Sequence, residues 1–213
     1  MTLDYALTVF ITIITIVDPI GMVPVYIPIA NRFPVSKHTK IILMSTTIAL
    51  IISTIFLFIG KHLFKYLQIN YNAIYIVGGI LLFMTGLDMI NARPRRTRSS
   101  PEEEEEALTL KDVSVFPLAI PMLSGPGILA TTIMFSSRFD SAMNYLIIFI
   151  SLVISFAITG LLMYFSSALI KILGQTGINV MDRIMGIILC SLAVQFVLNA
   201  LSNTFLSGGG VHP

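Results

Sequence analysis

The chain has 213 residues, of which 55% are apolar and 11% are charged, whereas a typical soluble domain is about 25% charged. This composition, with a formal net charge of only +2, excludes an ordinary soluble domain and indicates an integral membrane protein. The basic residues lie in loops without interleaved aromatic residues, which argues against a nucleic-acid-binding surface, and a lone Cys190 excludes an intramolecular disulfide.

Apolar runs of about 20 residues predict six membrane spans, each long enough to cross the roughly 30 Å hydrocarbon core of a bilayer as a helix. Runs of this length favour an all-α bundle over an outer-membrane barrel. The spans are Leu3–Ala30, Ile41–Gly60, Tyr71–Ile90, Val113–Phe135, Tyr145–Phe165 and Val180–Leu201. We expect two three-span units, residues 1–92 and 113–206, joined by a charged linker, 93–112, and followed by a disordered tail, 207–213.

The first span contains an acid, two prolines and a glycine between Asp18 and Pro24, where the middle of the span should be dry. An ionised carboxylate at that depth costs about 2.5 to 3.5 kcal/mol on insertion scales, so an acid there usually faces a partner, a cavity or a ligand. We therefore predict a broken helix at Asp18. The fourth span contains helix breakers of its own, namely Pro117, Pro121, Gly125, Pro126 and Gly127.

The linker carries a run of arginines followed by a run of glutamates, Glu102 to Glu106, and has too few apolar residues to pack. We interpret it as a flexible cytoplasmic connector. Short cytoplasmic loops carry an excess of lysine and arginine, which here predicts that both termini lie outside the cytoplasm. The cytoplasmic side would hold Arg32, Lys37, Lys40, Arg93, Arg95, Arg96, Arg98, Lys111, Lys171 and Arg183, and the other side only Lys61, Lys65 and Arg138.

A weak internal repeat relates the two halves at an offset of about 106 to 107 residues. Prolines, glycines and amides match in order, whereas matches among isoleucines would carry no weight in so apolar a chain. Since each half holds an odd number of spans, the second half enters the membrane from the opposite side, and the halves are predicted to be inverted repeats. The matched pairs are Pro19 with Pro126, Gly21 with Gly127, Arg32-Phe33 with Arg138-Phe139, Gln68 with Gln175, Asn72 with Asn179, Gly79-Ile80 with Gly186-Ile187, and Asp88 with Gln195.

Inverted repeats with broken helices are typical of secondary transporters, whose binding sites lie near the membrane midplane where the breaks of the two halves meet. Asp18-Pro19 and Gly125-Pro126 each place a permitted N-cap residue before a proline at the first helical position, so each break can restart a half-helix. The restarted end exposes unpaired amide donors and the positive end of the helix dipole, which favours a carboxylate. The alternative is that these prolines only kink helices for packing.

Three motifs combine these features: Asp18 through Pro24, Phe116 through Pro121, and Ser124 through Gly127. They resemble motifs of the MarC family of multi-spanning inner-membrane proteins, and the resemblance covers essentially the whole chain. It implies a six-span bundle in the cytoplasmic (inner) membrane that transports neutral amino acids, with glycine and alanine among the expected substrates. The family pattern commonly has asparagine at the place of Asp18, and another often follows the glycine where Met22 stands, a departure that bears on the coupling ion or the substrate.

An amino acid zwitterion needs two complementary poles in a dry site. Amide donors after the second break are predicted to take the carboxylate, and Asp18, or carbonyls freed at the first break, the ammonium. Asp18 and, more weakly, Asp88 are candidates for binding the coupling ion, whereas in the alternative Asp18 merely caps a helix and Asp88 has an interfacial or pairing role. The predicted substrate-binding residues are Asp18, Pro19, Gly21, Ser124, Gly125, Pro126 and Gly127, and Thr15, Thr131 and Gln195 are predicted for the cavity wall.

The resulting hypothesis is a secondary transporter of small neutral amino acids coupled to a proton or sodium gradient, whose partners are substrate, ion and lipid bilayer. We expect no enzymatic activity, cofactor, metal site or nucleic-acid partner. A channel or a non-transporting membrane scaffold is the alternative from another class. An intramembrane aspartyl hydrolase built on Asp18 and Asp88 is less favoured, because its dyad needs both carboxylates to share a proton at about 3 Å.

Overall fold

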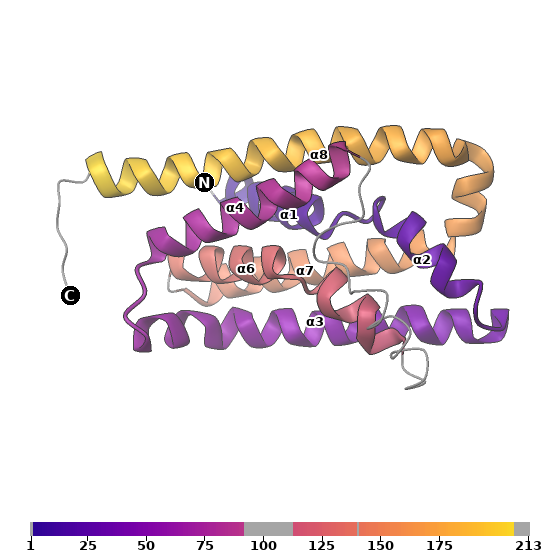
Figure 1. The fold of residues 1–213 in the computed structure, drawn as a ribbon. Coiled ribbons are helices and arrows are strands. Elements are labelled where there is room, and N and C mark those ends of the chain that lie inside the picture. Colours follow the sequence, from indigo (N-terminus) through magenta and orange to yellow (C-terminus); the bar gives the residue numbers. More distant parts are fainter. Residues whose placement is uncertain (1, 92–112, 140, 207–213) are drawn as a thin grey trace.

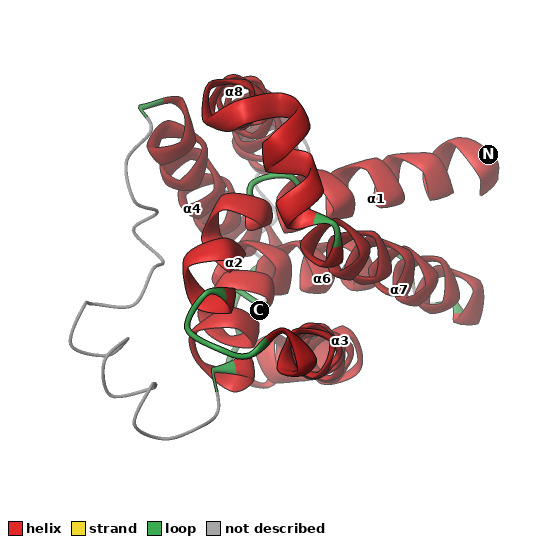
Figure 2. Cartoon of the chain, turned by 90° about the vertical axis from the view of Figure 1, so that its right-hand side faces the viewer, coloured by secondary structure: helices red, strands yellow, loops and turns green. Residues whose placement is uncertain are grey.

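The computed structural model describes residues 2–91, 113–139 and 141–206, and all regular structure in these ranges is helical (Figure 2). The predicted linker and tail lie outside the described residues. The helices are α1 (Thr2–Val17), α2 (Met22–Ala30), α3 (Val35–Tyr66), α4 (Tyr71–Ile90), η1 (Ser114–Leu123), α6 (Pro126–Arg138), α7 (Ala142–Tyr164) and α8 (Ser166–Leu206). Within these ranges the protein is all-α, as its composition predicts.

The helices form an elongated bundle, with α8 and α4 along one edge, α3 along the opposite edge, and α6 and α7 between them (Figure 1). The most extensive contact joins α4 to α8, and α3 packs on α7. In addition, α1 packs on α7 and η1 packs on α3. The first segment of each half therefore lies against the long middle helix of the other half, and the halves are interleaved.

Four helical segments are long and apolar enough to cross a membrane: α3, most of α4 (Asn72–Ile90), α7, and the long part of α8 (Thr176–Phe205). Leu3–Val17 and Met22–Ala30 pass the same test only as a pair bent by 41°, which gives up to five spans among the described residues. The sequence predicts six. The difference lies in the predicted fourth span.

The predicted fourth span, Val113–Phe135, consists of two short helices, η1 and α6, which meet at Ser124 and Gly125. Inside η1, Phe116 (φ −129°, ψ 126°) and Ile120 (φ −123°, ψ 125°) have extended backbones. Each directly precedes a proline, and proline disfavours the helical region for the residue before it. The chain therefore leaves helical geometry twice within η1 and again at Gly125, so neither piece has the length of a span.

The second predicted span is longer than its apolar run. Lys61, His62 and Lys65, which the sequence places in a turn, lie in the last turns of α3, which ends only at Tyr66. No glycine or proline follows Gly60 in this stretch, and polar side chains at a helix end can extend to the interface. The turn itself falls at Gln68, whose backbone is left-handed (φ 56°).

The last helix also begins earlier than predicted, at Ser166, and bends at Gly174. Gly174 has φ 63° and ψ 169°, a conformation that costs glycine little because it has no Cβ. The bend turns the first part of α8 away from its long apolar part (Figure 1). Asp182, which the sequence places at the N-terminal end of the sixth span, therefore lies inside α8.

Glycines bring the backbones of α4 and α8 into contact. A Cβ added at Gly86 would lie 2.6 Å from Cys190 Sγ and 2.8 Å from the Gly186 carbonyl oxygen, and one at Gly186 would lie 2.8 Å from the Gly86 carbonyl oxygen. A Cβ at Gly79 would lie 2.8 Å from the Ala193 carbonyl oxygen. Side chains do not tolerate such distances, so this contact depends on small residues, the usual means of helix association in lipid.

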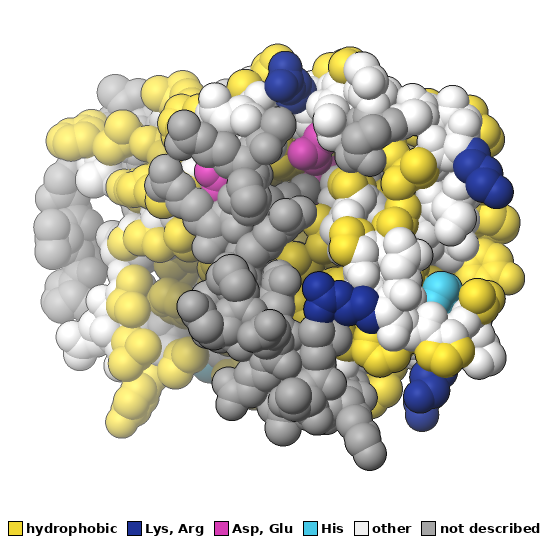
Figure 3. All heavy atoms as spheres, turned by 45° about the vertical axis from the view of Figure 1, so that its right-hand side comes forward, with side chains coloured by type: hydrophobic (Ala, Val, Ile, Leu, Met, Phe, Trp, Pro, Cys, Tyr) yellow, Lys and Arg dark blue, Asp and Glu magenta, His cyan; other side chains and the backbone are white. Residues whose placement is uncertain are grey.

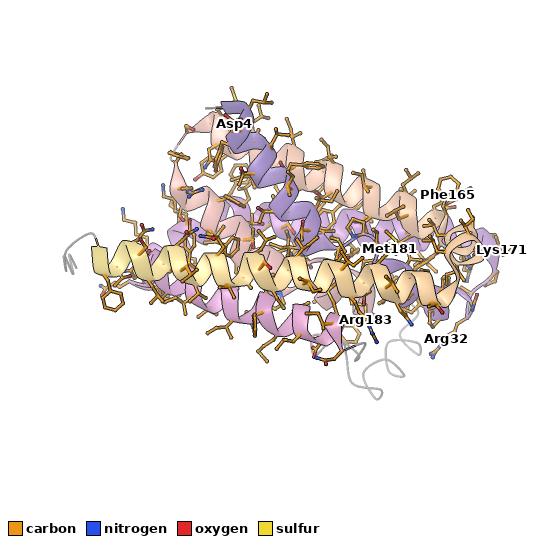
Figure 4. All side chains as sticks on the ribbon, turned by 90° about the horizontal axis from the view of Figure 1, so that it is seen from above. Asp4, Arg32, Phe165, Lys171, Met181 and Arg183 are labelled. Carbon is orange, nitrogen blue, oxygen red and sulfur yellow. The ribbon has the colours of Figure 1, made fainter. Side chains whose placement is uncertain are left out.

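Several charged side chains lie toward the two ends of the bundle (Figure 4). Seen from above, Arg32, Lys171 and Arg183 lie toward one end and Asp4 lies at the other (Figure 4). Apolar side chains cover much of the outer surface (Figure 3), and large ones such as Phe58 are more than half exposed. A surface of this kind suits lipid rather than water as the surrounding medium.

Candidate functional site

Asp18 both ends α1 and caps the turn that follows it. Its amide N–H donates to the Ile14 carbonyl oxygen at 3.0 Å, and its backbone is left-handed (φ 50°), which aspartate tolerates better than most residues. The carboxylate Oδ1 accepts a hydrogen bond from Gly21 N–H at 3.1 Å, and the residue is only 1% exposed. Pro19 lies in the connecting turn, so α2 begins at Met22 and not at Pro19 as the sequence predicts.

Ser124 and Gly125 separate η1 from α6. The amide and the hydroxyl of Ser124 both donate to the Ala119 carbonyl oxygen, at 2.9 Å and 2.8 Å, and so close η1. Gly125 is the extended N-cap of α6 (φ −66°, ψ 170°) and Pro126 is in its first turn, as predicted. Amides in the first turn of a helix have no acceptor within the helix, so the backbone amides that follow Pro126 are not used by α6 itself.

A cavity of about 40 Å³ lies at the start of α6, with walls from α1, η1, α4, α6 and α8. Gly125, Pro126 and Gly127 line it, as do Ile16 of α1 and Leu82 of α4. A Cβ at Gly127 would lie 2.8 Å from Leu82 Cδ2 and 3.6 Å from Ile16 Cγ2, so glycine keeps this wall open. Since a water molecule needs roughly 10 to 15 Å³ by this measure, the cavity has room for about three.

The cavity includes only part of the predicted substrate site. Gly125, Pro126 and Gly127 line it, and Ile16, two residues before Asp18, brings α1 to its wall. The predicted residues that do not line it are Asp18, Pro19, Gly21 and Ser124. The last turn of α1 therefore lies near the start of α6 through Ile16. The Asp18 carboxylate instead accepts a hydrogen bond from Gly21 N–H in the turn that follows α1.

The remaining predicted residues lie in different surroundings. Asp88 is buried in α4 at 4% exposure. Thr15 donates to the Ile11 carbonyl oxygen at 2.7 Å, as threonine does inside helices, whereas the buried hydroxyl of Thr131 makes no hydrogen bond to any described residue. Gln195 is exposed and donates to Asn199 Oδ1 at 2.8 Å. None of these four lines the cavity at the start of α6.

A buried polar cluster that sequence reasoning missed is centred on Asn144 at the start of α7. The Tyr5 hydroxyl donates to Asn144 Oδ1 at 2.6 Å, and Asn144 Nδ2 donates to the carbonyl oxygens of Phe135 and Phe139 at 3.0 Å and 2.8 Å. The cluster ties α1 and α7 to the C-terminal end of α6. A lone asparagine directly before the predicted fifth span was its only signal in the sequence.

Among the described residues, no group of three or more histidine, cysteine, aspartate or glutamate side chains could hold a metal ion. The chemistry available at the breaks is therefore that of backbone donors, small side chains and the Asp18 carboxylate. Such groups can bind and orient a small polar molecule.

Comparison with known proteins places the chain in a family. The model described as "MarC family integral membrane protein" matches residues 3–205. The chain belongs to the MarC family. MarC relatives include a UPF0056 membrane protein of Pyrococcus horikoshii, 35% identical over 191 residues that cover 89% of this chain and 90% of the relative. A UPF0056 membrane protein of Aquifex aeolicus is 32% identical, with 91% of each chain covered, and YvbG of Bacillus subtilis is 30% identical, with 96% and 98% covered.

These MarC relatives come from bacteria and archaea, and their names describe membrane proteins without a substrate. Together with the apolar helices, the family indicates a multi-pass integral protein of the cell membrane. No solved structure matches the chain.

Proposed function

We propose that this MarC protein is a secondary transporter of small neutral amino acids such as glycine and alanine, driven by a proton or sodium gradient. The observation that carries the proposal is the cavity at the Gly125–Gly127 break, to which α1, η1, α4, α6 and α8 all contribute. A site walled by segments of both halves, at the start of a broken helix, is the arrangement typical of such transporters.

Contacts between α4 and α8 support the inverted repeat that this mechanism needs. At the offset of about 107 residues, the contact of Gly79 with Ala193 is the counterpart of the contact between Gly186 and Gly86. Cys190 Sγ lies 3.6 Å from the carbonyl oxygen of Phe83, its own counterpart. Reciprocal contacts of this kind are expected of a two-fold axis, which in the proposed repeat would pass between the halves. The breaks after α1 and η1 would then be equivalent.

The two breaks offer different poles to a zwitterion. Amide donors in the first turn of α6, with the positive end of its dipole, suit the substrate carboxylate. Asp18 supplies the negative charge at the other break, for the ammonium group or for the coupling ion. A neutral amino acid brings no third charge, so Gly127 and the apolar side chains that face it would limit substrate size.

The small volume of the cavity suits a closed state of the proposed transport cycle. About 40 Å³ accommodates a few waters rather than an amino acid, so substrate would enter only when the surrounding helices separate. The interleaved packing of α1 on α7 and η1 on α3 offers such a route, because moving one half against the other would open the breaks.

The distribution of charge supports a cytoplasmic-membrane location with both termini outside. Arg32, Lys171 and Arg183 lie toward the end of the bundle opposite Asp4 (Figure 4). The positive-inside rule makes their end the cytoplasmic one. The breaks would then lie between two differently charged faces.

The test is transport of labelled glycine and alanine into liposomes that contain the purified protein, under an imposed proton or sodium gradient. Gly127→Leu should abolish accumulation because its side chain would fill the cavity, whereas Gly160→Ala, where a Cβ meets neighbours only at 3.4 Å or more, should keep it. No accumulation or exchange by the folded wild-type protein under either gradient would sink the proposal. Single-channel currents instead would favour a channel.

A further inference from the structure

A second, larger cavity of about 240 Å³ lies at the other end of α6. Its lining comes from the first turns of α4, the last turn of α6 and the last turns of α8. Every lining side chain can form a hydrogen bond and one of them is a guanidinium, so the cavity suits a small anion. The lining residues are Tyr75, Arg138, Asn199, Ser202 and Asn203.

The buried cluster around Asn144 fixes the end of α6 that carries Arg138. Asn144 binds the carbonyl oxygens on either side of Arg138, those of Phe135 and Phe139. Tyr5 adds ring contacts, edge-on at 6.3 Å to Phe135 and 5.4 Å to Phe139. The helix end is therefore held by α1 and α7, and the backbone of Arg138 does not need to be ordered when a molecule binds.

Arg138 is the charged residue among those that line this cavity, and Tyr75 of α4 shares the wall with it. A planar guanidinium matches a carboxylate with two parallel hydrogen bonds. The side-chain oxygens of Ser202 and Asn203 add acceptors that suit an ammonium group, whereas Asn199 Oδ1 already accepts a hydrogen bond from Gln195. The lining thus offers complementary groups for both poles of an amino acid.

We propose that this cavity is a vestibule in which Arg138 captures the carboxylate of a small neutral amino acid before the molecule moves to the breaks. The inference rests on the transport function proposed above. The axis of α6 connects the two places, because the rise of about 1.5 Å per residue from Pro126 to Arg138 separates Arg138 from the small cavity by about 18 Å. The repeat also matches Arg32 at the end of α2 with Arg138, which gives the opposite face an arginine of its own (Figure 4).

A fluorescence titration tests the vestibule without relying on transport. The chain has no tryptophan, so Phe139→Trp places a single reporter beside Arg138, at a position 52% exposed. The detergent-solubilised reporter protein is titrated with glycine, with acetate and with methylammonium. Glycine and acetate should change the fluorescence saturably and methylammonium should not. Adding Arg138→Gln should weaken acetate and glycine binding roughly 10- to 100-fold, the range for a lost charged hydrogen-bond pair.

Two further variants separate recognition from general electrostatics and from misfolding. Lys65→Gln removes a cation in the last turn of α3 that does not line the cavity and should leave the titration unchanged. Arg138→Lys keeps the charge but loses the planar pair of donors, so its binding should fall between wild type and Arg138→Gln. Equal binding by the wild-type and Arg138→Gln reporter proteins, or no saturable change with glycine, overturns the vestibule.

Transport measurements distinguish the failure of this inference from the failure of the proposed function. In liposomes, Arg138→Gln should raise the KM for labelled glycine that enters from the Arg138 side and leave the maximal rate within about twofold. The reason is that the substitution removes an interaction that stabilises bound glycine and the rate-limiting transition state equally. An unchanged KM contradicts a role in capture. Saturable binding to the reporter in a protein that transports nothing would support the vestibule and refute the transport function.

Discussion

Replacing Asp18 by asparagine, glycine and alanine separates the backbone role of this residue from its charge. Asparagine keeps a side-chain oxygen for Gly21 N–H and tolerates the left-handed backbone, so the free energy of unfolding should change by less than about 0.5 kcal/mol. Glycine loses the capping oxygen but tolerates the left-handed backbone, and replacing a cap by glycine typically costs only a few tenths of a kcal/mol. Alanine loses the cap and adds a left-handed Cβ, worth about 1 to 2 kcal/mol, for a total of about 2 to 3 kcal/mol.

The assay for this series is thermal unfolding of the purified variants in detergent, followed by transport in liposomes. Alanine should lower the Tm by roughly 4 to 12 °C, glycine by less, and asparagine hardly at all. An alanine variant as stable as the asparagine variant would refute the assignment of a strained, capped turn at Asp18. In transport, Asp18→Asn should alter the pH or sodium dependence, and wild-type dependence in that folded variant would leave Asp18 with the capping role alone.

Other predictions concern packing and hydrogen bonds and are checked by the same thermal assay. Gly86→Ala should lower the free energy of unfolding by roughly 1 to 3 kcal/mol, because its Cβ would press on the backbone of α8. Gly160→Ala should lower it by less than about 0.5 kcal/mol. Equal losses in the two variants would contradict the close contact between α4 and α8. Asn144→Leu should lower the free energy of unfolding by about 2 to 4 kcal/mol, because it leaves two carbonyl oxygens and the Tyr5 hydroxyl without their hydrogen-bond partner. Tyr5→Phe should lower it by only about 1 kcal/mol. A larger loss for Tyr5→Phe than for Asn144→Leu would contradict the cluster. Gly174→Ala should cost about 1 kcal/mol despite open space around it, since φ is 63°, and no loss would argue against the bend.

The helical class and the position of the first break could be predicted from the sequence because they depend on local chemistry. Apolar runs fix where helices lie, and an acid followed by proline inside such a run marks where one must stop. In the same way, Gly125 followed by Pro126 inside an apolar run marks where α6 begins. The family, too, was correctly predicted from the motifs at the two breaks.

Features that depend on neighbouring helices could not be predicted in this way. The six-span count treated each apolar run as one span even where it contains a break, but Phe116 and Ile120 add two further departures from helical geometry before their prolines. Gln195 was expected at a cavity wall because of its repeat match, yet α8 presents it outward beside Asn199. Asn144 is one polar residue just before an apolar run in the sequence, and only packing brings Tyr5 to it.

The close contact between Gly86 and Gly186 has an evolutionary consequence if the proposed repeat is correct. In a symmetric homodimer, if residue i of one subunit contacts residue j of the other, then residue j of the first also contacts residue i of the second. The α4–α8 contact has this reciprocal form within one polypeptide. In a homodimer of two identical chains, every substitution would appear in both subunits. A substituted residue on the two-fold axis would then contact its own copy in the other subunit. Fusion removes that constraint, and under the proposed repeat Cys190 and Phe83, whose Sγ and carbonyl oxygen lie 3.6 Å apart, would be two copies of one position that have diverged.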